Sequence, residues 1–220
     1  AQSFVLFSGD IMDLASEDSL QANQFDTQYT SLRRMMSVMP MINAMGNHDG
    51  TQLFTKYFPY PFQGHYYWSF DYGPVHVAVV DQYADVSPTS AQWTWLKEDL
   101  ASARQPWKFI LLHEPGWSAG PHPDNEVVQK IIQPIAYHQG VAVIFAGHNH
   151  YYSRAEVDGV VHITTGGGGA PLYDPLPGSA NVQYAQKSYH YLKVEVSGNI
   201  LRLTALTPEN AVIDSFTITH

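Results

Sequence analysis

The chain has 220 residues, of which 45% are hydrophobic and 13% aromatic, enough for a packed core and inconsistent with a disordered protein. Its formal net charge of -9, without any cluster of lysine and arginine, argues against nucleic acid held on a basic face. The absence of cysteine excludes disulfides, thiolate metal sites and a cysteine nucleophile, and no apolar run reaches the ~20 residues of a membrane span.

Short apolar runs that end in polar loops alternate with helical patterns along the chain. In the first half they predict a strand at 4–7, a helix at about 19–39, a strand at 41–45, a loop at 50–65, a hairpin of strands at 66–70 and 75–80, and a helix starting at Ser87. In the second half they predict a strand at 107–112, a helix at 127–138, strands at 141–145 and 160–165, a glycine run at 166–169, and strands at about 189–196, 200–206 and 211–219.

Strand–loop–helix units followed by a run of strands predict an α/β (α+β) fold with mixed sheets and helices packed outside. No linker or repeat divides the sequence, so we expect one domain over 1–220, with the C-terminal strands at about 189–219. Polar clusters follow several of the predicted strands. Because ligands bind at the carboxyl ends of strands in open α/β sheets, we expect these clusters to meet there.

Four clusters carry oxygen and imidazole groups, each after an apolar strand: Gly9-Asp10 with Asp13, Gly46-Asn47-His48-Asp49, His113, and His148-Asn149-His150. Each cluster alone has an ordinary explanation. Asp10 suits a turn or a helix cap, His113 suits a hydrogen-bonded core histidine, and two histidines one residue apart are often a surface pair. Their shared position at strand ends favours a metal centre instead, because carboxylates and imidazoles are common metal ligands.

The ordered motifs Gly-Asp-x-x-Asp, Gly-Asn-His-Asp, strand-His and Gly-His-x-His resemble those of the calcineurin-like metallophosphoesterase superfamily, with its purple acid phosphatase-like branch, over residues 4 to 170. The resemblance implies a four-layer αββα sandwich of two mixed β-sheets flanked by helices. It also implies a phosphoric ester hydrolase, a phosphatase or phosphodiesterase, with two divalent or mixed-valence metal ions (zinc, manganese or iron).

The resemblance also implies metal ligands. Asp10 matches the carboxylate that bridges the two metals. Asn47, His113 and His148 match the remaining ligands of the second metal, and His150 matches a ligand of the first. The second site is therefore expected to be the more secure of the two.

Three further residues are expected to act on the substrate. His48 matches the histidine that contacts the phosphate and helps protonate the leaving group, and Asp13 matches the carboxylate that orients this histidine. His122 stands where purple acid phosphatases have a substrate-contacting histidine, although a plain surface histidine fits its Gly-Pro-His-Pro loop equally well. Asp13 replaces the iron-binding tyrosine of purple acid phosphatases, so the resemblance implies no tyrosinate colour and implies ferric iron less strongly.

The sequence departs from the superfamily at its N-terminus. The Asp-x-His or Asp-x-Gly motif that normally precedes Gly-Asp, and the strand that carries it, have no counterpart in the nine residues before Asp10. Three explanations would each account for this: a longer natural protein, a strand from another chain, or catalysis by the second metal alone. We expect the first of these, and a homo-oligomer or partner is a further way to cover the sheet edge that the missing strand leaves.

The expected function is hydrolysis of a small phosphate ester by a metal-activated water. The alternative from another class is a truncated or degenerate relative that binds metal or phosphate with little or no catalysis. A carbohydrate-binding module would use the aromatic residues but leaves the ordered metal ligands unexplained. The processed-looking start Ala1-Gln2-Ser3 favours a secreted or periplasmic location over others, without fixing the compartment.

Overall fold

A computed structural model describes residues 3–13, 27, 30, 32–49, 51–58 and 64–220. In the N-terminal part, β1 (Val5–Phe7) pairs in parallel with β2 (Met41–Asn43), as a two-stranded sheet. The short helix α2 (Thr51–Tyr57) follows. Most of the helix predicted at 19–39 lies outside the described residues, and its described part at 32–36 is helical.

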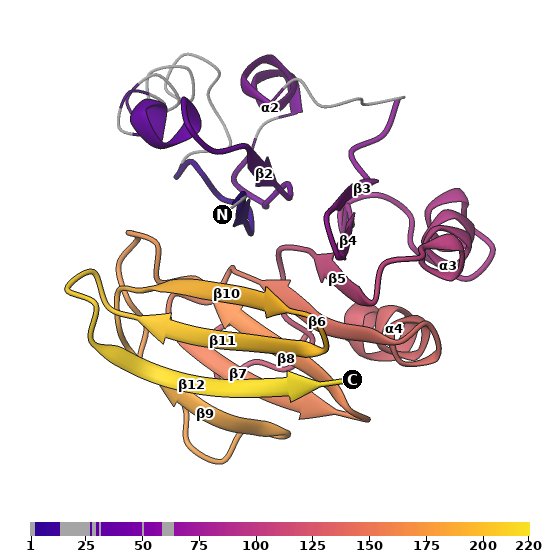
Figure 1. Ribbon diagram of the computed structural model, residues 1–220. Coiled ribbons are helices and arrows are strands. Elements are labelled where there is room, and N and C mark those ends of the chain that lie inside the picture. The colour runs from indigo at the N-terminus through magenta and orange to yellow at the C-terminus, as the bar shows by residue number, and fades with distance from the viewer. Residues whose placement is uncertain (1–2, 14–26, 28–29, 31, 50, 59–63) are drawn as a thin grey trace.

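A seven-stranded mixed sheet forms the centre of the molecule (Figure 1). Its strands in chain order are β3 (Trp68–Tyr72), β4 (Val75–Val79), β5 (Trp107–Leu111), β6 (Val141–Ala146), β7 (Tyr152–Val157), β8 (Val160–Thr165) and β9 (Val182–Gln186). In space they lie in the order β3-β4-β5-β6-β8-β7-β9. The four strands β4, β5, β6 and β8 are parallel, while β3, β7 and β9 pair antiparallel.

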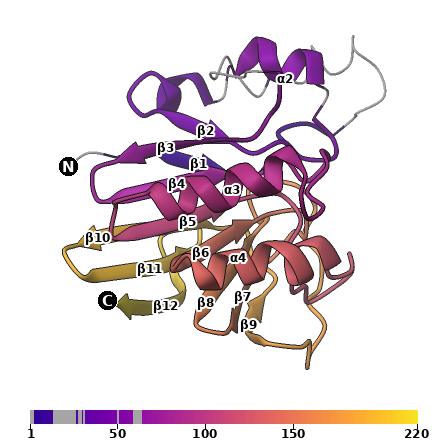
Figure 2. The same ribbon diagram turned by 90° about the vertical axis from the view of Figure 1, so that its right-hand side faces the viewer.

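Helices cover one face of this sheet (Figure 2). They are α3 (Ala91–Ser102) and the continuous helical segment η1 (Val128–Ile132) and α4 (Gln133–His138). Because side chains alternate along a strand, Ile110 of β5 packs with Leu96 of α3 and Ile132 of η1, while Phe109 and Leu111 point to the opposite face. The central strands are thus buried on both faces, which explains their continuous apolar sequences.

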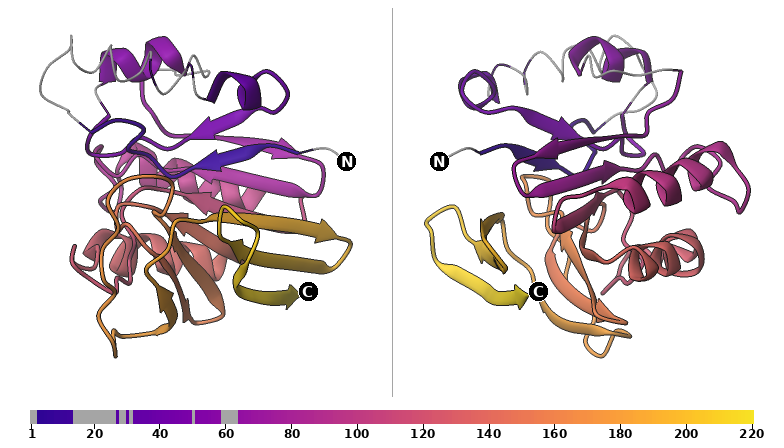
Figure 3. Two further views of the ribbon diagram at one scale, coloured as in Figure 1. Left: turned by 90° about the vertical axis from the view of Figure 1, so that its left-hand side faces the viewer. Right: turned by 45° about the vertical axis from the view of Figure 1, so that its right-hand side comes forward.

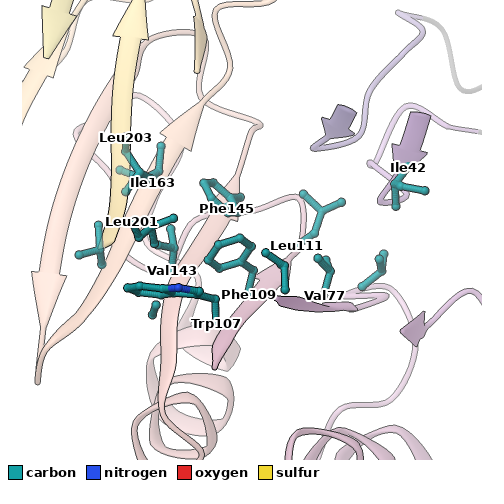
Figure 4. Packing of buried hydrophobic residues seen from close by; sticks show 14 of the residues in the cluster. Ile42, Val77, Trp107, Phe109, Leu111, Val143, Phe145, Ile163, Leu201 and Leu203 are labelled. Atoms are coloured by element: carbon teal, nitrogen blue, oxygen red, sulfur yellow. The ribbon is translucent and has the colours of Figure 1, made fainter. Parts of the chain in front are cut away.

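A three-stranded antiparallel sheet covers the other face (Figure 3). It consists of β10 (Tyr191–Ser197), β11 (Ile200–Leu206) and β12 (Val212–Thr219). Leu201 and Leu203 of β11 are fully buried in one core with Phe109 and Phe145 of the large sheet, and Ile42 of β2 belongs to the same core (Figure 4). The polar outer positions of β10 and β12 stay exposed, as alternation predicts.

The structure confirms the α/β fold with mixed sheets and corrects several details. The loop predicted at 50–65 is wrong at 51–57, where α2 forms and brings Phe54 into ring contact with Phe58 one helical turn later. The strands β7 and β9 were not predicted from the sequence. The helix expected from Ser87 begins at 91, capped by the Ser90 hydroxyl, which accepts from the Trp93 amide. Within the described chain, no helix has the length and apolar character to cross a lipid bilayer.

Candidate metal centre

Four loops that follow parallel strands meet at one place. Asp10 comes three residues after β1, Asn47 four residues after β2, and His113 and His148 two residues after β5 and β6. The carboxyl ends of parallel strands share one edge, so strands of two different sheets deliver these side chains together. The sequence prediction that the clusters meet is confirmed for these residues, since their side-chain atoms contact one another.

The loops approach closely because glycine occupies the crossing points. A Cβ on Gly9 would lie 2.7 Å from Nδ1 of His113, one on Gly147 would lie 2.6 Å from Oγ of Ser8, and one on Gly46 would collide with the Asp10 carboxylate. Asp10 itself has φ of 56° and His148 has φ of 63°, the left-handed region that non-glycine residues seldom adopt. Such strain at two neighbouring polar residues is typical of a functional site.

Asp49 locks two of these loops together. Its buried carboxylate accepts hydrogen bonds from the main-chain nitrogens of Asp10 at 3.0 Å, Ile11 at 3.2 Å and Gly46 at 2.9 Å. Burial, with the nearby charge of Asp10, raises the pKa of Asp49 to about 6 despite these donors. Asp49 was not among the predicted site residues, although its place in Gly-Asn-His-Asp was the signal that it belonged to the site.

The side-chain oxygen and nitrogen atoms that face one another in the site carry lone pairs, and few of them carry a proton. Nδ1 of His113 lies 2.6 Å from the Ser8 carbonyl oxygen, so this nitrogen carries a proton and donates it. Nε2 then faces Oδ2 of Asp10 at 3.0 Å, Oδ1 of Asn47 at 3.0 Å and Nδ1 of His148 at 3.2 Å. A carboxylate and an amide oxygen are acceptors, so a positive charge, either a proton or a metal cation, must lie among these atoms.

These atoms fit a metal cation. In the part of the chain that the structure describes, one carboxylate oxygen and two imidazole nitrogens, from Asp10, His113 and His148, lie within 4.8 Å of one another. They are borderline ligands of the kind that zinc, manganese and iron accept, and Asn47 adds a neutral oxygen beside them. The contact between His113 and the Ser8 carbonyl fixes the imidazole orientation, as ligating histidines require.

The electrostatics agree with a cation site. Burial and the neighbouring imidazoles of His113 and His122 lower the pKa of His148 to about 4, so its ring is neutral with a free lone pair at neutral pH. Burial alone would raise the pKa of Asp10, but the hydrogen bond and charge of His113 outweigh it and keep Asp10 ionised. Burial alone would lower the pKa of His113, but the hydrogen bond and charge of Asp10 raise it.

His48 lies beside this group. Its main-chain nitrogen donates to Oδ1 of Asp10 at 2.8 Å, and Nδ1 of its ring lies 2.5 Å from the main-chain oxygen of Asp13. This contact is made by the main-chain carbonyl of Asp13, whereas the sequence predicted that the Asp13 carboxylate orients His48, and that role stays a prediction. This contact leaves Nε2 of His48 as the nitrogen that can face a substrate.

The remaining predicted residues lie at a second set of loops. The His122 ring packs on His148 with centroids 4.2 Å apart. His150 is outside the cluster of Asp10, His113 and His148, and its Nδ1 lies 2.8 Å from the carbonyl oxygen of Pro171. Tyr173, which the sequence analysis did not single out, stacks on His150 at 4.3 Å.

Another pair missed from the sequence, Tyr83 and Glu114, lies next to His113, with the Tyr83 and His113 ring centroids 6.5 Å apart. Glu114 accepts a hydrogen bond from the Tyr83 hydroxyl at 3.2 Å and from Nδ2 of Asn125 at 2.8 Å. Gln82 braces this region, since its side-chain oxygen accepts from the main-chain nitrogens of both His113 and Glu114. Only tertiary structure brings the loop after β4 against the loop after β5, so no local sequence signal marks these contacts.

The chain is similar to known proteins over much of its length. The family model described as calcineurin-like phosphoesterase matches residues 1–152. Purple acid phosphatase 18 of Arabidopsis thaliana is 30% identical over 185 residues, which cover 71% of this chain and 42% of that protein. Purple acid phosphatase 22 of the same plant is 33% identical over 116 residues, which cover 47% of this chain and 27% of that protein. The chain thus spans less than half the length of these curated relatives.

Solved structures share the fold. The purple acid phosphatase PPD1 from yellow lupin (Lupinus luteus) seeds superposes with a TM-score of 0.81 at 21% identity, covering 98% of this chain and 46% of that one. GAP50 of Plasmodium, described as the anchor in the inner membrane complex, gives a TM-score of 0.71 at 13% identity, covering 98% of this chain and 88% of that one. At these identities the likeness concerns the fold.

Proposed function

The chain belongs to the calcineurin-like phosphoesterase family, and on that premise we propose that it is a metal-dependent hydrolase of small phosphate esters. The observation that carries the proposal is the convergence of Asp10, His113 and His148 without enough protons to satisfy their facing atoms. A site that demands a positive charge where strained loops meet is suited to binding a cation and, next to it, an anionic phosphate.

Asp10, Asn47, His113 and His148 would hold the more secure cation, and Asp10 with His150 would hold the other. A bound dication supplies charge for phosphate oxygens and lowers the pKa of a coordinated water. Zinc, manganese and iron all accept this oxygen and nitrogen set. His150 does not belong to the group of Asp10, His113 and His148 whose ligand atoms lie within 4.8 Å of one another, which supports unequal affinities for the two cations.

We assign leaving-group protonation to His48. Its Nδ1 is held by the Asp13 main chain and its backbone by the Asp10 carboxylate, which leaves Nε2 to give a proton to the departing ester oxygen. General acid help of this kind contributes about 10²–10⁴-fold to a rate. We assign contact with the phosphate or its ester group to His122, and its packing on His148 supports this role.

The second candidate is a metal- or phosphate-binding protein with little or no catalysis. The observation that favours it is that only three His and acidic side chains cluster at ligand distance among the described residues. Metal analysis of the purified chain separates the two, since two equivalents support a complete centre and one or none supports the non-catalytic candidate.

The test of the proposal is His148→Ala, assayed with p-nitrophenyl phosphate and bis-p-nitrophenyl phosphate in a screen of zinc, manganese and iron. Loss of turnover by more than ~100-fold is expected, since the ring lies in the cluster and ligand loss disables metal sites. His138→Ala, an exposed histidine at the end of α4, is the matched control and should keep full activity. Full turnover by His148→Ala would contradict the proposal.

A partner at one sheet edge is a separate proposal. β1 pairs only with β2 and β10 only with β11 among the described strands, although Leu6 and Leu192 pack on the same core. Val194 has the same strand parity as Leu192 and is 36% exposed. We propose that another copy of the chain or another strand covers this edge. We also propose that the complete fold is a single four-layer αββα domain. Light scattering of the purified chain tests whether another copy binds.

A further inference from the structure

The segment Pro171–Tyr173 contacts His150 at three points. The Pro171 carbonyl oxygen lies 2.8 Å from Nδ1 of the His150 ring. The main-chain nitrogen of Tyr173 donates to the His150 carbonyl oxygen at 3.0 Å. The Tyr173 ring stacks on the imidazole with centroids 4.3 Å apart and an angle of 14° between the planes. Main chain and ring of His150 are therefore held by the same short segment.

The segment is anchored at both ends. Before it, Gly166 packs so tightly that a Cβ would collide with the Asn149 carbonyl oxygen. After it, the main-chain nitrogen of Leu176 donates to the Ala119 carbonyl oxygen at 2.7 Å, which ties the segment to the loop that carries His122. The contacts on His150 are therefore built from a fixed backbone.

Tyr173 also closes a row of rings across the site. Its ring meets His122 edge-on at 5.6 Å, and His122 in turn packs on His148 at 4.2 Å. Tyr173 is half-exposed and belongs to none of the three hydrophobic clusters that the described residues form. Its ring contacts are with imidazoles of the candidate site, so core packing does not explain its position.

We propose that Tyr173 is a positioning residue for His150, which rests on the proposed role of His150 as a metal ligand. Nδ1 of His150 keeps its proton and donates it in a hydrogen bond to the Pro171 carbonyl oxygen, and this leaves the lone pair on Nε2 for a cation. The Tyr173 ring fixes the plane of the imidazole, so Nε2 keeps one direction. Partners that orient a ligating histidine typically contribute 10–100-fold to metal affinity.

The experiment is a calorimetric titration of the purified, metal-free chain with Zn²⁺. Tyr173→Leu removes the stacked ring but keeps the main-chain donor, and we expect the weaker Zn²⁺ equivalent to lose about 10-fold in affinity. Tyr173→Phe keeps the stack and should bind within about 2-fold of the wild-type chain. Tyr137→Leu, at an exposed tyrosine of α4, is the control for a general effect of losing a surface ring.

A double variant separates positioning from a structural role. If Tyr173 acts through His150, Tyr173→Leu should change Zn²⁺ affinity no further in a His150→Ala background. Three results would each overturn the inference. They are a wild-type Zn²⁺ affinity in Tyr173→Leu, an equal loss of Zn²⁺ affinity with and without His150, and a wild-type chain that binds no second Zn²⁺ equivalent. The titration measures Zn²⁺ binding and not turnover. A chain that binds Zn²⁺ as expected but hydrolyses no ester in a separate assay would contradict the proposed function and leave the role of Tyr173 intact.

Discussion

The carboxylate of Asp49 accepts a 3.0 Å hydrogen bond from the main-chain nitrogen of Asp10, thirty-nine residues earlier in the chain. The same carboxylate holds Gly46 at the start of its own loop. The strained backbone of Asp10, with φ of 56°, is therefore supported by a buried acceptor on the neighbouring loop. The side chain that holds these loops in shape is thus distinct from the side chains of Asp10, His113 and His148 that face one another in the candidate metal centre.

Asp49→Asn should destabilise the chain and loosen the site. An amide has only one oxygen for the donors of Asp10, Ile11 and Gly46, and its NH₂ group would face a main-chain N–H. We expect a loss of about 1–3 kcal/mol in the free energy of unfolding, measured by urea denaturation without metal. Asp174→Asn, at an exposed carboxylate paired with Lys187, should leave the urea midpoint unchanged. Equal urea midpoints for the two variants would contradict this stabilising role of the Asp49 carboxylate.

Added cation should stabilise the folded chain through the site. A ligand that binds only the folded state at about 100 times its Kd adds about 2.7 kcal/mol to the free energy of unfolding. We therefore expect Zn²⁺ or Mn²⁺ to raise the melting temperature, and EDTA to reverse the rise. Asp10→Asn should abolish this response, since it removes the carboxylate that faces His113. A variant that responds like the wild-type chain would show that the cation binds elsewhere.

The motifs at the strand ends were predictable from the sequence because their information is local. An apolar run followed by Gly-Asp or Gly-His predicts both a strand and the polar loop after it, and those loops meet by topology. What escaped prediction depends on contacts between distant segments. Tyr173 reaches His150 from a loop that follows another strand, and Tyr83 reaches Glu114 across two loops. Nothing in either local sequence marks the pairing.

The missed elements have a related cause. β7 has the mixed sequence of Tyr152–Val157, and it is buried at its start only because β8 and β9 flank it. Its strand character comes from pairing, so alternation alone did not predict it. α2 was mistaken for a loop because its surroundings are rich in proline and aromatic residues, although Phe54 and Phe58 have helical spacing.

A histidine far from the candidate site should make stability depend on pH. Both ring nitrogens of buried His76 lie 2.8 Å from carboxylates, Nδ1 from Asp71 and Nε2 from Asp99, so both carry protons and the ring is an imidazolium. Burial alone would lower the pKa of His76, but the hydrogen bonds and charges of Asp99 and Asp71 raise it above its usual value.

The sign follows from linkage. Because the pKa of His76 is higher in the folded chain than in the unfolded one, its contribution to stability is complete below about pH 6.5 and is lost as the pH rises through the folded value. We expect the free energy of unfolding of the wild-type chain to fall as the pH rises above about 6.5. His76→Gln should be less stable at pH 6 and should fall less over that range, and a parallel fall in both chains would contradict the assignment.

Asp214 should couple the two sheets that enclose the core. It lies on β12 of the small sheet, and its Oδ2 accepts from the Tyr152 hydroxyl at 2.9 Å and from Nε of Arg154 at 2.7 Å, both on β7 of the large sheet. The ion pair is largely shielded from solvent, so an amide in place of the carboxylate leaves the Arg154 guanidinium without its counter-charge and with one neutral oxygen to share with the Tyr152 phenol.

Asp214→Asn should therefore lower the free energy of unfolding by about 1–3 kcal/mol. Glu126→Gln breaks an ion pair of similar length, 2.6 Å to Lys130, on the surface of the helical segment before α4, and it should leave stability unchanged because water screens exposed pairs. Urea denaturation of both variants tests the contrast. Equal effects would mean that apolar packing alone holds the small sheet against the large one, since β11 contributes Leu201 and Leu203 to that core in either variant.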